Sequence, residues 1–148
     1  MSKMVTLREV LQPAEKGKYA VGAFNANNME IVQAIVESAV EERSPVILQA
    51  SQGAIRYAGL DYIVSLVKTA VAGADIPIVL HLDHGTDFEQ VMLCIRHGFS
   101  SVMFDGSRLP LKENIEITRR VMDVARAVGV SVEGELGKIG GTEDDISV

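Results

Sequence analysis

The sequence of 148 residues contains a single cysteine, Cys94, which excludes an intramolecular disulfide framework. No hydrophobic signal segment follows Met1, and every apolar run is far shorter than the roughly 20 residues needed to cross a bilayer. These absences favour a reducing compartment. We therefore expect a cytoplasmic protein with no membrane partner.

Basic residues are also in deficit, because 14 Lys and Arg stand against 20 Asp and Glu, a net charge of −6. No basic cluster compensates, so a nucleic-acid partner is disfavoured. A hydrophobic content of 47% is enough to bury a sizeable core. No linker, low-complexity stretch or composition shift marks a boundary, and we expect residues 1–148 to form a single domain.

Short segments rich in Val and Ile alternate with amphipathic segments of helix length. The pattern predicts strands at 20–24, 46–50, 78–82, 101–104 and 130–135, and helices at 29–42, 60–71, 88–96 and 111–128, with an extra helix at 6–16. Successive strands start about 23–32 residues apart, the size of one βα unit. The sequence therefore predicts an α/β fold with a parallel sheet covered on both faces.

Two architectures have this pattern, an open doubly wound sheet and part of a (β/α)₈ barrel. An open nucleotide-binding sheet favours a glycine fingerprint after the first strand, and residues 24–28 contain no glycine. The chain also stops at Val148 without a helix to cover its fifth strand. We interpret it as an unfinished α/β unit.

Polar side chains follow each predicted strand at its carboxyl end, where parallel α/β folds gather catalytic groups. They are Asn25, Ser51, Asp83, His84, Asp105 and Glu135. An ordinary solvated rim is the alternative interpretation.

The segment 81–85, His-Leu-Asp-His-Gly, combines imidazole and carboxylate groups at a strand end. His84 alone cannot hold a zinc ion, because catalytic zinc takes three protein ligands. A satisfied structural histidine is the alternative for either His81 or His84. Strand alternation places His81 on the face of Asp83, where it can orient that carboxylate.

Glu133 and Glu135 lie on one side of the last strand end and precede a glycine-containing acidic segment. Glycine pairs allow residues 136–148 to form a mobile active-site loop that carries Glu143 inward as a proton acceptor. The alternative is a solvated acidic loop.

Together these motifs resemble the class II, metal-dependent fructose-bisphosphate aldolases. The resemblance rests on segments 81–85, 98–107 and 131–144, with 19–25 and 45–51 matching the family's opening. It covers the whole chain in the family's order. It implies a (β/α)₈ TIM barrel of which this chain supplies about the first five strands.

The resemblance also implies a metal site. His84 would be one of three histidine ligands of a catalytic Zn²⁺, with the other two on later strands, and Asp105 and Glu135 would hold a second divalent metal position. The residues that bind substrate phosphates, and a monovalent K⁺ or Na⁺ site, would mostly lie beyond Val148.

The family's reaction is the reversible cleavage of fructose 1,6-bisphosphate into dihydroxyacetone phosphate and glyceraldehyde 3-phosphate, through a zinc-stabilised ene-diolate in glycolysis and gluconeogenesis. The resemblance assigns Asp83 to the proton of the C4 hydroxyl and Glu143 to the proton of the three-carbon ketone, with Asn25 and Ser51 as substrate contacts. Some relatives carry a second acid where this chain has Thr142. A homo-oligomer, at least a dimer, is implied.

Several alternatives stay open. A tagatose-bisphosphate aldolase differs from the family's main activity at one stereocentre of the substrate. A metal-dependent hydrolase on a similar barrel typically has a His-x-His pair in the first strand, where this chain has Asn-Ala-Asn at 25–27. A Schiff-base lysine is disfavoured, because only Lys138 lies near the strand ends. A non-catalytic half-barrel module is the remaining possibility.

Overall fold

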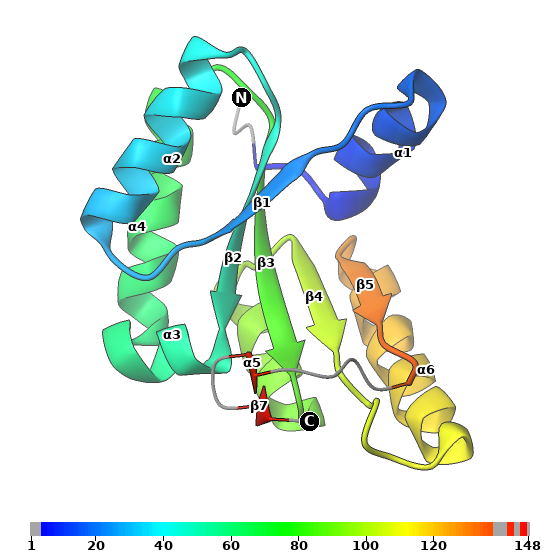
Figure 1. The fold of residues 1–148 in the computed structure, drawn as a ribbon. Helices are drawn as coiled ribbons and strands as arrows, with labels where there is room; N and C mark the ends of the chain where they lie inside the picture. The colour runs from blue at the N-terminus through cyan, green and yellow to red at the C-terminus, as the bar shows by residue number, and fades with distance from the viewer. Residues whose placement is uncertain (1–3, 138–141, 144–145, 148) are drawn as a thin grey trace.

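Five parallel strands form a curved sheet in which the strands follow one another in chain order (Figure 1). The computed structural model describes residues 4–137, 142–143 and 146–147. The strands of the sheet are β1 (Gly22–Asn25), β2 (Val46–Ser51), β3 (Ile78–Gly85), β4 (Ser101–Phe104) and β5 (Ser131–Gly134). The helices are α1 (Leu7–Gly17), α2 (Met29–Glu41), α3 (Gln52–Ala58), α4 (Leu60–Gly73), α5 (Phe88–His97) and α6 (Leu111–Val128). A separate antiparallel pair consists of β6 (Thr142–Glu143) and β7 (Ile146–Ser147).

The predicted alternation of strands and helices is confirmed. Capping residues fix where several of the helices begin and end. The side chains of Asn28 and Asp87 each accept a hydrogen bond from the backbone N–H three residues further on, which caps α2 and α5. Gly98 and Gly129 end α5 and α6 in the left-handed conformation, with φ of 94° and 72°.

Strand β3 and a short helix differ from the prediction. Strand β3 continues past residue 82 to Gly85, and the seven-residue helix α3 follows β2 directly. Helix α3 is too short to show a repeating apolar pattern, but Ser51 caps it by accepting a hydrogen bond from Ala54 N–H at 3.2 Å.

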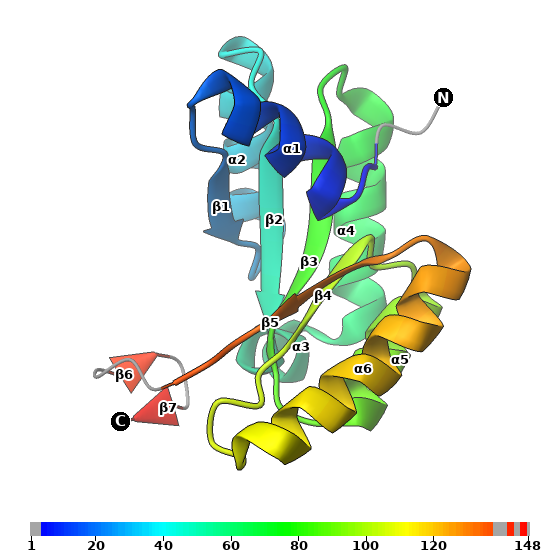
Figure 2. The same ribbon diagram turned by 90° about the vertical axis from the view of Figure 1, so that its right-hand side faces the viewer.

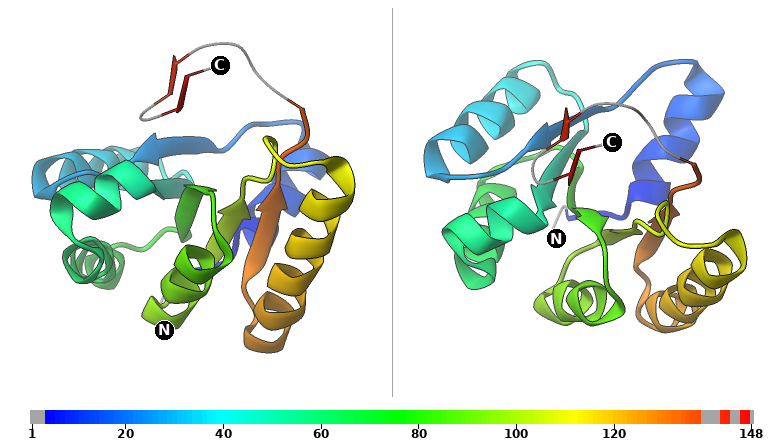
Figure 3. Two further views of the ribbon diagram at one scale, coloured as in Figure 1. Left: turned by 90° about the horizontal axis from the view of Figure 1, so that it is seen from below. Right: turned by 60° about the horizontal axis from the view of Figure 1, so that its bottom comes forward.

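Alternate residues of the central strands face opposite sides of the sheet. The side chains that pack against the outer helices in the main core include Val46, Leu48, Ala50, Ile78, Leu80, Leu82, Val102 and Phe104. Helices α2, α4, α5 and α6 cover this convex side, and the short β6–β7 pair lies on the concave side (Figure 3). The residues between those core positions therefore face the concave side.

Helix α1 packs across the amino ends of the strands (Figure 2). Its Val10 forms a small second core with Ile47 and Val79, which point to the concave side of β2 and β3. The chain before α1 is tied to the same sheet, because Val5 N–H donates to Ile78 O at 2.9 Å. Helix α1 thus closes one end of the concave side.

The expectation that every strand is covered on both faces is wrong for the edges. All four residues of β1 are exposed, and β5 is only partly buried. Each of these strands pairs with a single neighbour in the sheet as described, whereas β2, β3 and β4 have two. Within the described residues, no helix has the length and apolar character to cross a membrane.

Gly85 gives a test of the packing between β3 and β4. A Cβ added at Gly85 would lie 2.7 Å from the backbone oxygen of Met103 and within 3 Å of Leu82 and Val91. We expect Gly85→Ala to lower the free energy of unfolding by roughly 1–3 kcal/mol, measured by urea denaturation. The matched control is Gly73→Ala at the end of α4, where an added Cβ meets no atom within 4 Å and the change should be neutral or mildly stabilising. Equal stability of the two variants would contradict this packing.

Candidate active site at the carboxyl ends of the strands

Polar side chains are concentrated on the concave side of the sheet near its carboxyl end. The strand register places Gln49 beside His81 and Ser51 beside Asp83, and it pairs His81 with Ser101. These residues occupy the positions between the core residues, so their side chains face the concave side.

His84 breaks the alternation of β3. After Leu82, which packs in the core, and Asp83, a regular strand would direct residue 84 back toward the helices. His84 instead has a left-handed backbone with φ of 47°, and the register with β4 shifts between Leu82 and Gly85. A non-glycine residue in this conformation costs on the order of 1–3 kcal/mol and is typical of functional sites. The bulge brings the imidazole into the group of acidic side chains.

The imidazole of His84 lies between three carboxylates. Its Nδ1 is 3.1 Å from Asp105 Oδ2 and 3.6 Å from Glu135 Oε2, and its Nε2 is 3.9 Å from Asp83 Oδ1. Ligand atoms of His84, Asp105 and Glu135 all lie within 4.8 Å of one another. One imidazole nitrogen and two carboxylate oxygens at this spacing are a suitable donor set for a divalent cation.

The surroundings of Asp105 stabilise its charged form although its side chain is buried. Its side chain is only 6% exposed, and burial by itself raises the pKa of this carboxyl group. Hydrogen bonds from Ser107, including its backbone N–H at 3.0 Å, and from His84 outweigh burial and hold the pKa of Asp105 below its usual value. The charged form is the one that binds a cation.

His81 occupies a deeper position than His84 and has a different environment. It is 2% exposed, its Nδ1 lies 2.9 Å from Ser101 Oγ, and its Nε2 lies 3.4 Å from Glu133 Oε2. Burial, and secondarily the nearby His84, lowers the pKa of His81 to about 4, so the ring is neutral at pH 7. A neutral ring that donates Nε2–H to Glu133 accepts the Ser101 hydroxyl proton at Nδ1.

Glu133 belongs to the same group of charges. Burial raises the pKa of its carboxyl group, and the neighbouring Asp83 and Glu135 raise it further, whereas His84 acts in the opposite direction. Three carboxylates therefore lie around one partly exposed imidazole, with Glu133 nearby, and a bound cation would relieve the repulsion among these like charges.

The structure brings four of the seven predicted site residues together, namely Asp83, His84, Asp105 and Glu135. Asn25 and Ser51 end the neighbouring strands β1 and β2, and the oxygen of Ser51 is used to cap α3. The backbone of Glu143 pairs with Ile146 in the β6–β7 sheet, and the side chain of Glu143 lies outside the described part of the chain, as does most of the predicted 136–148 loop.

Two residues of this region received no role from the sequence. Glu133 faces His81, and the signal for it is the two-residue spacing from Glu135 on one strand face. Gln52 contacts the backbone of His84 from α3, and no sequence pattern points to it because the contact depends on the bulge.

The curved parallel sheet and the cluster at its carboxyl ends define the chain as the first part of a (β/α)₈ barrel, with ionisable groups where this fold carries its active sites. Residues 5–148 match the family described as fructose-bisphosphate aldolase class-II. The chain belongs to this family, whose members are lyases.

Curated relatives agree with this assignment. The fructose-bisphosphate aldolase of Giardia intestinalis is 51% identical over 97% of this chain and 45% of its own length, and that of Geobacillus stearothermophilus is 50% identical over 97% and 51%. The crystal structure of the YdjI aldolase from Escherichia coli K12 superposes with a TM-score of 0.86 at 29% identity, over 90% of this chain and 52% of that one. The chain spans about half the length of the curated relatives it matches. The predicted half of a barrel is thereby confirmed.

The buried histidine predicts a pH dependence of stability. Above pH 6.5 His81 is neutral in both folded and unfolded chains, but between pH 6.5 and about 4 only the unfolded chain takes up the proton. The free energy of unfolding should therefore fall as the pH is lowered through this window, by roughly 3 kcal/mol on account of this residue.

His81→Gln should show a smaller loss over the same window, measured by urea denaturation at several pH values. Gln90→Met on α5 is the matched control, because neither side chain titrates, and it should keep the parent slope. A parent slope in His81→Gln would refute the assignment of a neutral, buried His81.

Proposed function

We propose that this chain carries the first part of the active site of an aldolase that reversibly cleaves fructose 1,6-bisphosphate into dihydroxyacetone phosphate and glyceraldehyde 3-phosphate. The observation that carries the proposal is the cluster of His84, Asp105 and Glu135 beside Asp83. Family membership adds the substrate class, because the relatives are named for this sugar bisphosphate.

The donor set of His84, Asp105 and Glu135 suits a divalent cation, and we propose Zn²⁺ held by His84, with Asp105 and Glu135 at a second divalent position. When bound, such an ion stabilises negative charge that develops on substrate oxygens as the carbon–carbon bond breaks. We assign further zinc ligands, phosphate-binding residues and a K⁺ or Na⁺ site to the part of the barrel that the chain does not span.

Asp83 is placed to move a proton in this reaction. Its carboxylate ends β3 on the concave side and lies next to His84, with 19% of its side chain exposed. We assign it the proton of the substrate's C4 hydroxyl, which it accepts during cleavage and returns during condensation. Glu143 is assigned the proton of the three-carbon ketone, since cleavage needs a second proton transfer.

Asn25 and Ser51 are proposed to contact the substrate from the ends of β1 and β2. The cap of α3 uses the oxygen of Ser51 as an acceptor, so its O–H still serves as a donor. Asn25 is exposed on the edge strand, where its amide offers both a donor and an acceptor.

The activity is tested in a fusion of this chain to the carboxyl-terminal half of the Geobacillus stearothermophilus enzyme, which supplies the remaining strands. We expect the fusion to release triose phosphate from fructose 1,6-bisphosphate in a coupled assay. Asp83→Asn should lower kcat by roughly 100- to 10,000-fold, the usual contribution of a general acid–base group. Glu116→Gln on the outer helix α6 is the matched control and should retain the parent kcat.

Tagatose 1,6-bisphosphate is assayed in parallel. Preference for it would reassign the substrate within the family, and inertness of a folded, zinc-loaded fusion toward both sugars would reject the proposed function. An unchanged kcat in Asp83→Asn would remove that residue from the mechanism.

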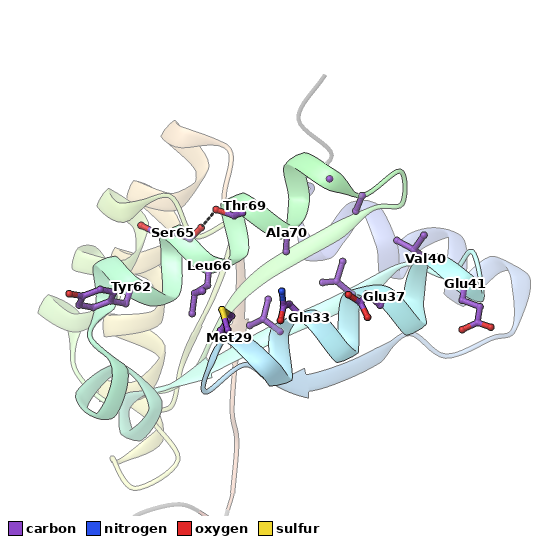
Figure 4. Close-up of a pocket in the computed structure, with 14 residues that line it drawn as sticks. Met29, Gln33, Glu37, Val40, Glu41, Tyr62, Ser65, Leu66, Thr69 and Ala70 are labelled. Atoms are coloured by element: carbon purple, nitrogen blue, oxygen red, sulfur yellow. Dashed lines mark hydrogen bonds between the residues drawn. The ribbon is translucent and has the colours of Figure 1, made fainter.

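We further propose a homo-oligomer, at least a dimer, in the cytoplasm and in glycolysis. The free thiol of Cys94 is compatible with a reducing compartment. A groove of about 680 Å³ on the outer wall between α2 and α4 supports association (Figure 4). Met29 and Leu66 lie in its apolar part and Tyr62 at one end, where Tyr62 is 73% exposed.

Tyr62→Glu in the fusion should weaken the dimer by roughly 30-fold or more if this groove is the subunit contact, because buried aromatic residues dominate such interfaces. Tyr57→Glu is the matched control, since Tyr57 is equally exposed on α3 but does not line the groove. Light scattering over a concentration series measures the change. Dimers of equal affinity in both variants would exclude this surface.

A further inference from the structure

Gln52 joins the first turn of α3 to the end of β3. Its side-chain Nε2 donates to the backbone oxygen of His84 at 2.7 Å and to Thr86 Oγ1 at 2.9 Å. Both N–H groups of the amide are thereby used. The backbone carbonyl that Gln52 holds belongs to the residue with the left-handed conformation.

The backbone on the other side of the bulge is also fixed. Asp105 N–H donates to Gly85 O at 2.9 Å, and Gly85 is packed so closely against β4 that no side chain fits there. A return of His84 to the extended conformation would have to rotate its carbonyl away from Gln52. The amide of Gln52 therefore holds the carbonyl of the one residue in β3 that has a positive φ.

The direction of the His84 imidazole depends on this backbone. In the observed conformation Nδ1 faces Asp105 and Nε2 faces Asp83, although strand alternation would direct the ring toward the helices. We infer that Gln52 is a positioning residue, which holds the His84 backbone in its left-handed conformation and so aims the imidazole at the cation site. The inference rests on the proposed function for the identity of that site.

The test compares the parent 148-residue chain with Gln52→Met and with the matched control Gln90→Met. Gln90 lies on the outer helix α5, and its side-chain amide donates to Cys94 Sγ at 3.4 Å. Methionine keeps the length of glutamine and removes its donors. We expect the ¹³C chemical shifts of the metal-free chain to report a left-handed His84 in the parent and in Gln90→Met, and a mixed or extended His84 in Gln52→Met.

Co²⁺ affinity, followed by its visible absorbance and by competition with a chelator, should fall by roughly 10- to 100-fold in Gln52→Met and remain at the parent value in Gln90→Met. Thr86→Val removes one of the two acceptors of the amide and should produce a smaller change in the same direction. It takes the place of Gln52→Met if that variant does not fold.

Parent-like His84 shifts in both Gln52→Met and Thr86→Val would overturn the inference. Loss of the His84 signature with unchanged Co²⁺ affinity would also overturn it, because the aim of the imidazole would then not depend on Gln52. These measurements need no turnover, so an inactive fusion with a His84 signature sensitive to Gln52 would reject the proposed function and leave the positioning role standing.

Discussion

The left-handed backbone of His84 allows β3 to contribute both to the core and to the candidate site. Up to Leu82, β3 sends alternate side chains into the core beneath the helices and onto the concave side. The bulge then gives two consecutive residues, Asp83 and His84, to the concave side, which a regular strand cannot do. A carboxylate and an imidazole thereby lie next to each other at the end of one strand. The requirement for glycine at position 85 follows from the same bulge, because the chain must pass close to the backbone of β4.

The fold was predictable because its signals are local. Val- and Ile-rich segments mark buried strands, Asn28 and Asp87 mark helix starts, and glycine marks helix ends. Helix α3 was missed because seven residues do not complete enough turns to show a period. The exposure of β1 was missed for a different reason, since coverage of a strand depends on its neighbours in space and not on its own composition.

The candidate site was predictable to the level of its strand ends. Parallel strands bring their carboxyl ends to one edge, so Asp83, Asp105 and Glu135 were expected to be close. Alternation related His81 to Asp83, but the sequence left open which histidine is structural, because the bulge that moves His84 has no sequence period. The contact of Gln52 could not be predicted for the same reason. Its partner is a backbone oxygen, and only the folded chain defines the direction of that oxygen.

The two histidines of β3 have different environments, although they are only three residues apart. His81 is buried on β3, and burial lowers its pKa to about 4. Its two ring nitrogens lie against Ser101 of β4 and Glu133 of β5. His84, three residues later, is partly exposed and faces carboxylates on both sides of its ring. Because like charges at this spacing repel one another, the carboxylates favour any cation that enters, and the neutral His81 beneath them adds no competing positive charge. The concave side is closed at its amino end by α1 and remains accessible at the end that carries these groups. The carboxyl ends of the strands therefore give a cation access to these carboxylates.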